Sequence, residues 1–150
     1  MTKNVAISAC LLGNKCRYDA KDNKNEDLLE KLEGHTLISF CPEEHAFGTP
    51  RPTMDLVAYE EGNKAISNES GVDLSAPVQT YAQNFFDTHT NIDLFIGKDR
   101  SPSCGVCSAK LYDKEKNLLS TNEAGLMAKE ALERGIVCVD AEAYLSLSWL

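Results

Sequence analysis

Four short, continuous apolar runs constrain the fold of this chain more than any other feature of its sequence. They are rich in Val, Ile, Leu and Phe, and they cover Asn4–Ala9, Thr36–Cys41, Ile92–Gly97 and Ile136–Val139. Unbroken apolar runs of this length are typical of strands in a parallel sheet whose two faces are both covered. We therefore expect four central strands with helices on each side of them.

Three helical patterns lie between these runs. The stretch Glu26–Glu33 carries three leucines and is followed by a glycine, which is a common residue just after a helix end. Ser75 is a candidate cap for a second helix, in which apolar residues recur at helical spacing. Ser120 and Glu123 form a capping-box pattern ahead of a third helix that ends at Arg134.

Two further segments have the pattern of β-hairpins. Leu56–Tyr59 and Ala65–Ser67 flank a polar turn, and Lys110–Asp113 is separated from Leu118–Leu119 by another. Strands that alternate with helices predict an α/β fold. We expect a single layered domain over residues 1–150, with a mainly parallel central sheet of about four strands, short hairpins, and helices on both faces.

Composition limits the partners of the chain. A formal net charge of −8 argues against binding to a nucleic-acid polymer, because phosphate contacts need concentrated Lys and Arg. It leaves room for a small-molecule substrate such as a free base. The first apolar run is too short for a membrane span and lacks the cleavage pattern of a signal peptide, so no membrane partner and a cytoplasmic location are expected. Either a monomer or a homodimer is compatible with these features.

Six cysteines in a reducing compartment indicate metal binding or catalysis before they indicate disulfides. Three of them share one kind of position. Cys10 follows the first apolar run, Cys41 ends the second, and Cys104 lies in the loop after the third. Sites in open α/β sheets form outside the carboxyl ends of the strands, so the sequence predicts that these three thiols meet at one edge of the sheet.

The residues around these thiols form three unusual motifs. They are Ser8–Asp19, which begins Ser-Ala-Cys-Leu-Leu-Gly, then Cys41–Glu43, and Ser101–Gly105 with the sequence Ser-Pro-Ser-Cys-Gly. In this combination the chain resembles the thiouracil desulfidase-like family, also known as domain of unknown function 523. The resemblance extends from Ser8 through the run at Ile136. One departure is the segment Glu44–Thr49, which forms a shorter loop here than is usual in the family.

The resemblance implies an enzyme with a [4Fe-4S] cluster. Three Cys hold the cluster in the family, and the matching metal and cofactor ligands here are Cys10, Cys41 and Cys104. By the same resemblance, Glu43 and Ser101 are the catalytic candidates. The expected reaction is hydrolytic removal of sulfur from a small thiolated nucleobase or a related thiocarbonyl, with the substrate sulfur bound to the iron that has no protein ligand. A soft metal with an open position suits a thiocarbonyl sulfur.

Two more residues are candidates for binding the substrate. Ser103 lies within the Ser-Pro-Ser-Cys-Gly motif, and Arg51 follows the second cysteine motif. Arg51 would hold an anionic edge of the substrate, although a structural ion pair is an equal alternative. Ser101 and Ser103 have a simpler alternative role, which is to shape a turn with Pro102.

The sequence leaves alternatives open for the cysteines. The chain could be a non-catalytic zinc module with Cys ligands, or a thiol redox protein that uses Cys104 and Cys107 and has a thiol of low pKa. Cys16 or Cys107 could serve as a further ligand or be inert. Cys138 lies within an apolar run, where core packing is the expected role. His45 is expected to be a solvated loop residue.

Overall fold

The computed structural model describes residues 2–13, 24–48, 51 and 53–146. It has an α/β architecture with a parallel sheet of four strands, as the apolar runs predicted. The strand order in this sheet is β2 (Thr36–Phe40), β1 (Asn4–Ser8), β5 (Leu94–Gly97) and β8 (Cys138–Asp140). All three neighbouring pairs are parallel, so the four carboxyl ends lie at the same edge.

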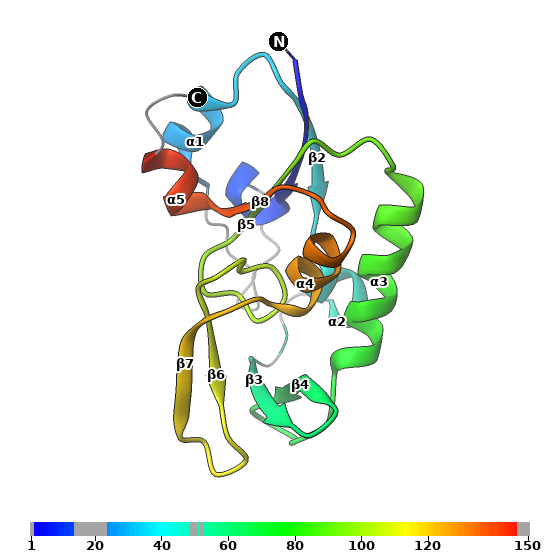
Figure 1. Ribbon diagram of the computed structural model, residues 1–150, viewed down its shortest axis with the longest axis vertical. Helices are drawn as coiled ribbons and strands as arrows, with labels where there is room; N and C mark the ends of the chain where they lie inside the picture. The colour runs from blue at the N-terminus through cyan, green and yellow to red at the C-terminus, as the bar shows by residue number, and fades with distance from the viewer. Residues whose placement is uncertain (1, 14–23, 49–50, 52, 147–150) are drawn as a thin grey trace.

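The two predicted hairpins combine into a second sheet, which lies below the first in Figure 1. Its strand order is β4 (Gly62–Ser67), β3 (Met54–Tyr59), β6 (Ala109–Tyr112) and β7 (Leu118–Glu123). The two hairpin pairs are antiparallel, whereas β3 and β6 pair in parallel. The two hairpins are therefore joined into one mixed sheet through the β3–β6 pair.

Helices cover both faces of the parallel sheet, as expected. They are α1 (Glu26–Lys31), α2 (Pro42–Phe47), α3 (Ser75–Thr88), α4 (Leu126–Glu133) and α5 (Ala141–Ser146), with a short 3-10 helix, η1 (Ala9–Leu12). Val5 and Ile7 point to one face and share a core cluster with residues of α1 and α5. Ala6 and Phe95 share another cluster with residues of α3 and α4.

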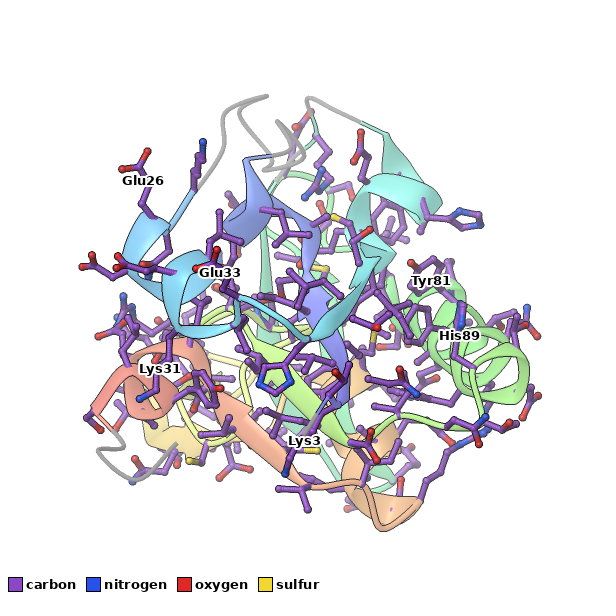
Figure 2. All side chains as sticks on the ribbon, turned by 90° about the horizontal axis from the view of Figure 1, so that it is seen from above. Lys3, Glu26, Lys31, Glu33, Tyr81 and His89 are labelled. Atoms are coloured by element: carbon purple, nitrogen blue, oxygen red, sulfur yellow. The ribbon has the colours of Figure 1, made fainter. Side chains whose placement is uncertain are left out.

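Contacts between the covering helices reinforce each layer. Lys31 of α1 donates a hydrogen bond of 2.9 Å to the carbonyl oxygen of Tyr144 in α5, and its ammonium lies 5.0 Å from the centre of the Tyr144 ring. Figure 2 shows Lys31 beside α5.

None of the helices in the described ranges is long and apolar enough to cross a membrane.

The predicted capping box at Ser120 and Glu123 is wrong. Both residues lie in β7, and α4 begins at Leu126 after Gly125. The first N–H groups of α4 are instead satisfied by the loop after β5, because Leu126 donates to the carbonyl of Pro102 and Met127 donates to that of Ser103. The start of α4 is thus fixed by the loop that carries Cys104.

Two other predicted boundaries need correction. The segment predicted as a loop after the second cysteine motif is helical from Pro42 to Phe47, because proline suits the first helical position and the acidic Glu43 and Glu44 suit the first turn. Ser75 is the first residue of α3 and makes no capping bond to that helix. Its hydroxyl instead accepts a hydrogen bond from the N–H of Ala65 in β4.

Candidate metal centre

The three predicted thiols converge on one cavity at the carboxyl edge of the parallel sheet. The cavity has a volume of about 250 Å³ and is open to solvent on one side. Residues from the ends of β1, β2 and β5 line it: Ser8, Ala9, Cys10, Phe40, Cys41, Pro42, Glu43, Arg51, Lys98, Asp99, Arg100, Ser101, Pro102 and Cys104. The three cysteines thus line one cavity at the edge where the strand ends placed them.

The position of each thiol follows from the strand that precedes it. Cys10 lies in η1, directly after β1, and Cys41 is the residue before α2, directly after β2. Strands β2 and β5 are the two neighbours of β1, so the loops that follow them meet above its end. Cys104 belongs to the loop after β5. It packs so closely on this strand that a Cβ at Gly97 would overlap its carbonyl oxygen.

A hydrogen bond to α3 also holds the backbone of Cys41. Its N–H donates a hydrogen bond of 3.2 Å to the hydroxyl of Tyr81, which Figure 2 labels on that helix. The ring of Tyr81 also packs against the ring of His45, with 5.0 Å between the ring centres. His45 is an exposed residue of α2 and is not among the residues that line the cavity, which agrees with the expected solvated role.

The electrostatics of the cavity disfavour a free thiolate at Cys104. Burial raises the pKa of Cys104 well above its ordinary value, and the nearby charges of Cys41, Glu43 and Cys10 raise it further. A hydrogen bond from Ser8 opposes these effects. The thiol of Cys104 therefore loses its proton more readily when a positive group binds beside it, since a coordinating metal deprotonates its thiol ligands. The three donors are soft sulfur ligands, and such ligands suit an iron–sulfur group.

The described residues show no compact site for a single metal ion. Within residues 2–13, 24–48, 51 and 53–146, no group of three or more His, Cys, Asp and Glu side chains lies close enough together to hold one metal ion. A zinc ion with Zn–S bonds of about 2.3 Å would draw its thiolates together around a single centre. A cluster with several irons binds each thiolate at a separate corner, so its ligands need not meet at one centre.

Glu43 lies between two polar partners. Its Oε2 accepts a hydrogen bond of 3.0 Å from the hydroxyl of Ser103, and its Oε1 lies 3.6 Å from Nε of Arg51. The Arg51 side chain is only 5% exposed, and its guanidinium also donates to the carbonyl oxygen of Gly48. The structural ion pair that the sequence left open for Arg51 is thus present, and it is made with the predicted catalytic carboxylate.

The two serines of the third motif have different surroundings. The hydroxyl oxygen of Ser101 accepts hydrogen bonds from the N–H groups of Ser103 and Cys104, at 3.2 and 3.0 Å. Its own proton remains available to donate, and Ser101 lines the cavity. Ser103 is fully buried behind the cavity wall, and its contact is with Glu43.

The remaining cysteines are distinct from these three. Cys107 is exposed, and Cys138 lies at the start of β8, half-buried against the core, where burial raises its pKa to about 12. The redox alternative required a thiol of low pKa, but burial raises the pKa of both Cys104 and Cys107. Cys16 lies outside the described residues.

Four polar residues that line the cavity were not predicted as site residues from the sequence. Ser8 accepts a hydrogen bond of 3.1 Å from the N–H of Lys98, which in turn donates from Nζ to the carbonyl of Asp99. Asp99 is buried, and that burial raises its pKa. Arg100 completes the wall beside them. Lys98, Asp99 and Arg100 directly follow β5, so the strand-end argument that located the thiols would also have indicated them.

Comparison with known proteins agrees with this geometry. The family model described as 2-thiouracil desulfurase matches residues 5–143. A solved structure of TudS, described as a [4Fe-4S]-dependent thiouracil desulfidase, is similar over 99% of this chain and 100% of its own, with 27% sequence identity and a TM-score of 0.73. No curated protein matches the chain significantly. The resemblance seen in the three cysteine motifs is thereby confirmed, and this chain belongs to the 2-thiouracil desulfurase family.

Proposed function

We propose that this protein is an iron–sulfur-dependent desulfidase, which removes sulfur from a small thiolated nucleobase or a related thiocarbonyl by hydrolysis. The observation that carries the proposal is the convergence of Cys10, Cys41 and Cys104 with Glu43 on one cavity. Membership of the 2-thiouracil desulfurase family and the similarity to TudS support it. We take residues 1–150 as a single desulfidase-like domain.

Three cysteine ligands account for three corners of a four-iron, four-sulfur cluster. Cys10, Cys41 and Cys104 would hold it through their thiolates, each from the end of a different strand. When bound, the cluster would supply one iron without a protein ligand, a soft Lewis acid able to take the substrate's sulfur.

Glu43 is the proposed general base. Its carboxylate lines the cavity and is held by Ser103 and by Arg51, so it can accept a proton from a water molecule placed beside the substrate. That water's oxygen adds to the carbon that carries sulfur, and the C–S bond breaks. The products are the carbonyl compound and hydrogen sulfide, which together contain all the atoms of the thiocarbonyl and water. No electron donor or acceptor is needed.

The other polar side chains position the reactants. Ser101 has a hydroxyl proton to donate to the substrate or to the water, because its oxygen is already an acceptor for two backbone N–H groups. Arg51 holds the second oxygen of Glu43 and is the proposed contact for an anionic edge of the substrate. Ser103, predicted as a substrate contact, is better placed to orient Glu43.

Neighbouring glutamates allow a sharp test. Glu43 lines the cavity, whereas Glu44 is the next residue of α2 and is exposed. We expect anaerobically reconstituted wild-type protein and Glu44→Gln to release uracil and sulfide from 2-thiouracil at similar rates. Glu43→Gln should lower kcat by about 100-fold or more, the range that a general base contributes. Iron and sulfide content, measured in parallel, should be the same in all three proteins.

Two results would contradict the proposal. One is a wild-type protein that carries its cluster but releases no sulfide from 2-thiouracil or other thiocarbonyl bases. The other is a Glu43→Gln variant that retains wild-type activity, which would remove this carboxylate from the reaction.

A further inference from the structure

We propose that Asp140 is a positioning residue that fixes the loop carrying Cys104. The inference rests on the proposed function only in treating Cys104 as a ligand. Asp140 is the last residue of β8, where it pairs in register with Gly97 of β5. The fourth strand of the parallel sheet thus supplies an anchor at the edge where the other three supply thiols.

The carboxylate of Asp140 is buried, with 4% of the residue exposed, and both of its oxygens are engaged. Oδ1 accepts hydrogen bonds from the N–H of Val106 at 2.7 Å and from the hydroxyl of Ser108 at 2.9 Å. Oδ2 accepts from the N–H of Cys107 at 2.9 Å. Three donors from the segment that directly follows Cys104 therefore converge on one carboxylate.

This contact also reaches the start of the loop. The hydroxyl oxygen of Ser108 accepts a hydrogen bond of 2.8 Å from the N–H of Arg100. Arg100 has a φ of 66°, a left-handed conformation that a residue other than glycine keeps only when its surroundings hold it there. Through Ser108, the carboxylate of Asp140 connects the two ends of the segment 100–108, with Cys104 at its centre.

A carboxylate suits this position better than any neutral side chain. All three partners are donors, and an ionised carboxylate has only acceptor sites. An asparagine of the same shape would direct an N–H group at one of these donors, and that donor would lose its acceptor. Hydrogen bonds to a charged group are also stronger than those between neutral groups.

Loss of the anchor should free the end of the loop without disturbing the other two ligands. Cys10 and Cys41 are held by η1 and by the start of α2, neither of which contacts Asp140 through the hydrogen bonds described. We therefore expect Asp140→Asn to expose the thiol of Cys104 selectively. In the reconstituted protein the same variant should hold less iron and sulfide than wild type.

The test uses the full chain without metal, so it is independent of the enzyme's activity. Iodoacetamide labelling is followed at each cysteine by peptide mass spectrometry. Asp113→Asn is the matched control, because Asp113 also accepts three hydrogen bonds, but in the turn between β6 and β7. We expect Asp140→Asn to speed labelling of Cys104 by at least about tenfold, the effect of losing hydrogen bonds to a charged group. Cys10 and Cys41 should stay within about twofold, and Asp113→Asn should match wild type.

Equal labelling of Cys104 in Asp140→Asn and wild type would overturn the proposal. So would equal acceleration at Cys10, Cys41 and Cys104, because that pattern reports general loosening. If Asp140→Asn does not fold, Ser108→Ala removes one of the three bonds and the link to Arg100, and it should give a smaller selective increase. If wild type never takes up iron, selective labelling still supports the anchor, and only the proposed function fails.

Discussion

Ser103 of the third cysteine motif donates a hydrogen bond of 3.0 Å to Oε2 of Glu43 in the second motif, across 60 residues of sequence. The bond joins the loop after β5 to the first turn of α2. Because Ser103 is fully buried, the carboxylate it holds keeps one fixed orientation at the cavity wall. The geometry of the proposed base therefore depends on the same loop that presents Cys104.

Replacement of Ser103 by alanine should impair catalysis more than substrate binding. A hydrogen bond to a charged group contributes about 1.5–3 kcal/mol, so kcat for 2-thiouracil should fall about 10- to 100-fold. KM should change by much less, because Ser103 is not among the residues that line the cavity. Steady-state kinetics at equal iron content measures both. Ser70→Ala, at an exposed position, serves as the control, and an unchanged kcat in Ser103→Ala would contradict the role.

Substitution of Gly97 by alanine should displace Cys104. A Cβ at this position would overlap the carbonyl group of Cys104, and backbone atoms cannot move aside as a flexible side chain does. We expect a loss of several kcal/mol of unfolding free energy, together with loss of iron binding. Gly34→Ala is a useful contrast, because a Cβ there meets nothing within 4 Å and adds only left-handed strain of about 1–2 kcal/mol. Urea unfolding of both variants gives the comparison, and equal losses would contradict this account.

Asp73 should stabilise the protein only above mildly acidic pH. A hydrogen bond with Ser75 at the start of α3 is the largest cause that lowers its pKa below the ordinary value of 3.8. As the pH falls, Asp73 is therefore protonated in the unfolded chain before it is protonated in the folded protein. Its stabilising effect is complete above about pH 5 and is lost as the pH falls through the folded-state pKa. Asp73→Asn should be less stable than wild type at pH 7, by no more than about 1 kcal/mol because the side chain is half-exposed. Thermal unfolding at pH 7 and pH 3 checks this, and an equal difference at both would contradict it.

Asp99 should show the opposite dependence. Burial raises the pKa of this carboxyl, and the negative charges of Asp140 and Glu142 raise it further. The hydrogen bond that Asp99 accepts from the N–H of Glu142 lowers the pKa, but by less than burial raises it. The folded state then favours the protonated form, so the stabilisation is present below the ordinary value of 3.8 and is lost as the pH rises through the folded-state pKa. Asp99→Asn removes the cost of a buried charge and should gain stability relative to wild type as the pH rises from 3 to 7. A relative loss over that range, measured by thermal unfolding, would show that the sign is wrong.

The sequence predicted those parts of the structure that depend on strand interiors and strand ends. Unbroken apolar runs identified the four parallel strands because helices cover both faces of this sheet. The central strands β1 and β5 are largely buried, whereas the edge strands β2 and β8 are only partly buried. Parallel direction then placed Cys10, Cys41 and Cys104 at one edge, since the carboxyl ends of such strands lie together. Strand order was not predictable, because neighbouring strands such as β1 and β5 pair residues that are about ninety positions apart.

Helix α4 and its end near Arg134 were predicted, but its start was placed wrongly because that start depends on distant backbone partners. Helix α4 begins with N–H groups that bond to carbonyls of Pro102 and Ser103, so no side-chain cap marks its start. Helix α2 was predicted as a loop because proline beside a thiol is also typical of a turn. Asp140 gave no local signal, and only its place at the end of the fourth strand connects it with the site.

Iron and acid-labile sulfide content of anaerobically reconstituted protein tests the central claim most directly. We predict a brown wild-type protein with about four iron and four sulfide per chain, the content of a cubane cluster. Cys10→Ser, Cys41→Ser and Cys104→Ser should each lose it, whereas Cys107→Ser and Cys138→Ser should keep it, because their thiols lie outside the cavity. A wild-type protein that stays colourless after reconstitution, or a cluster that survives in all three cavity variants, would contradict the account.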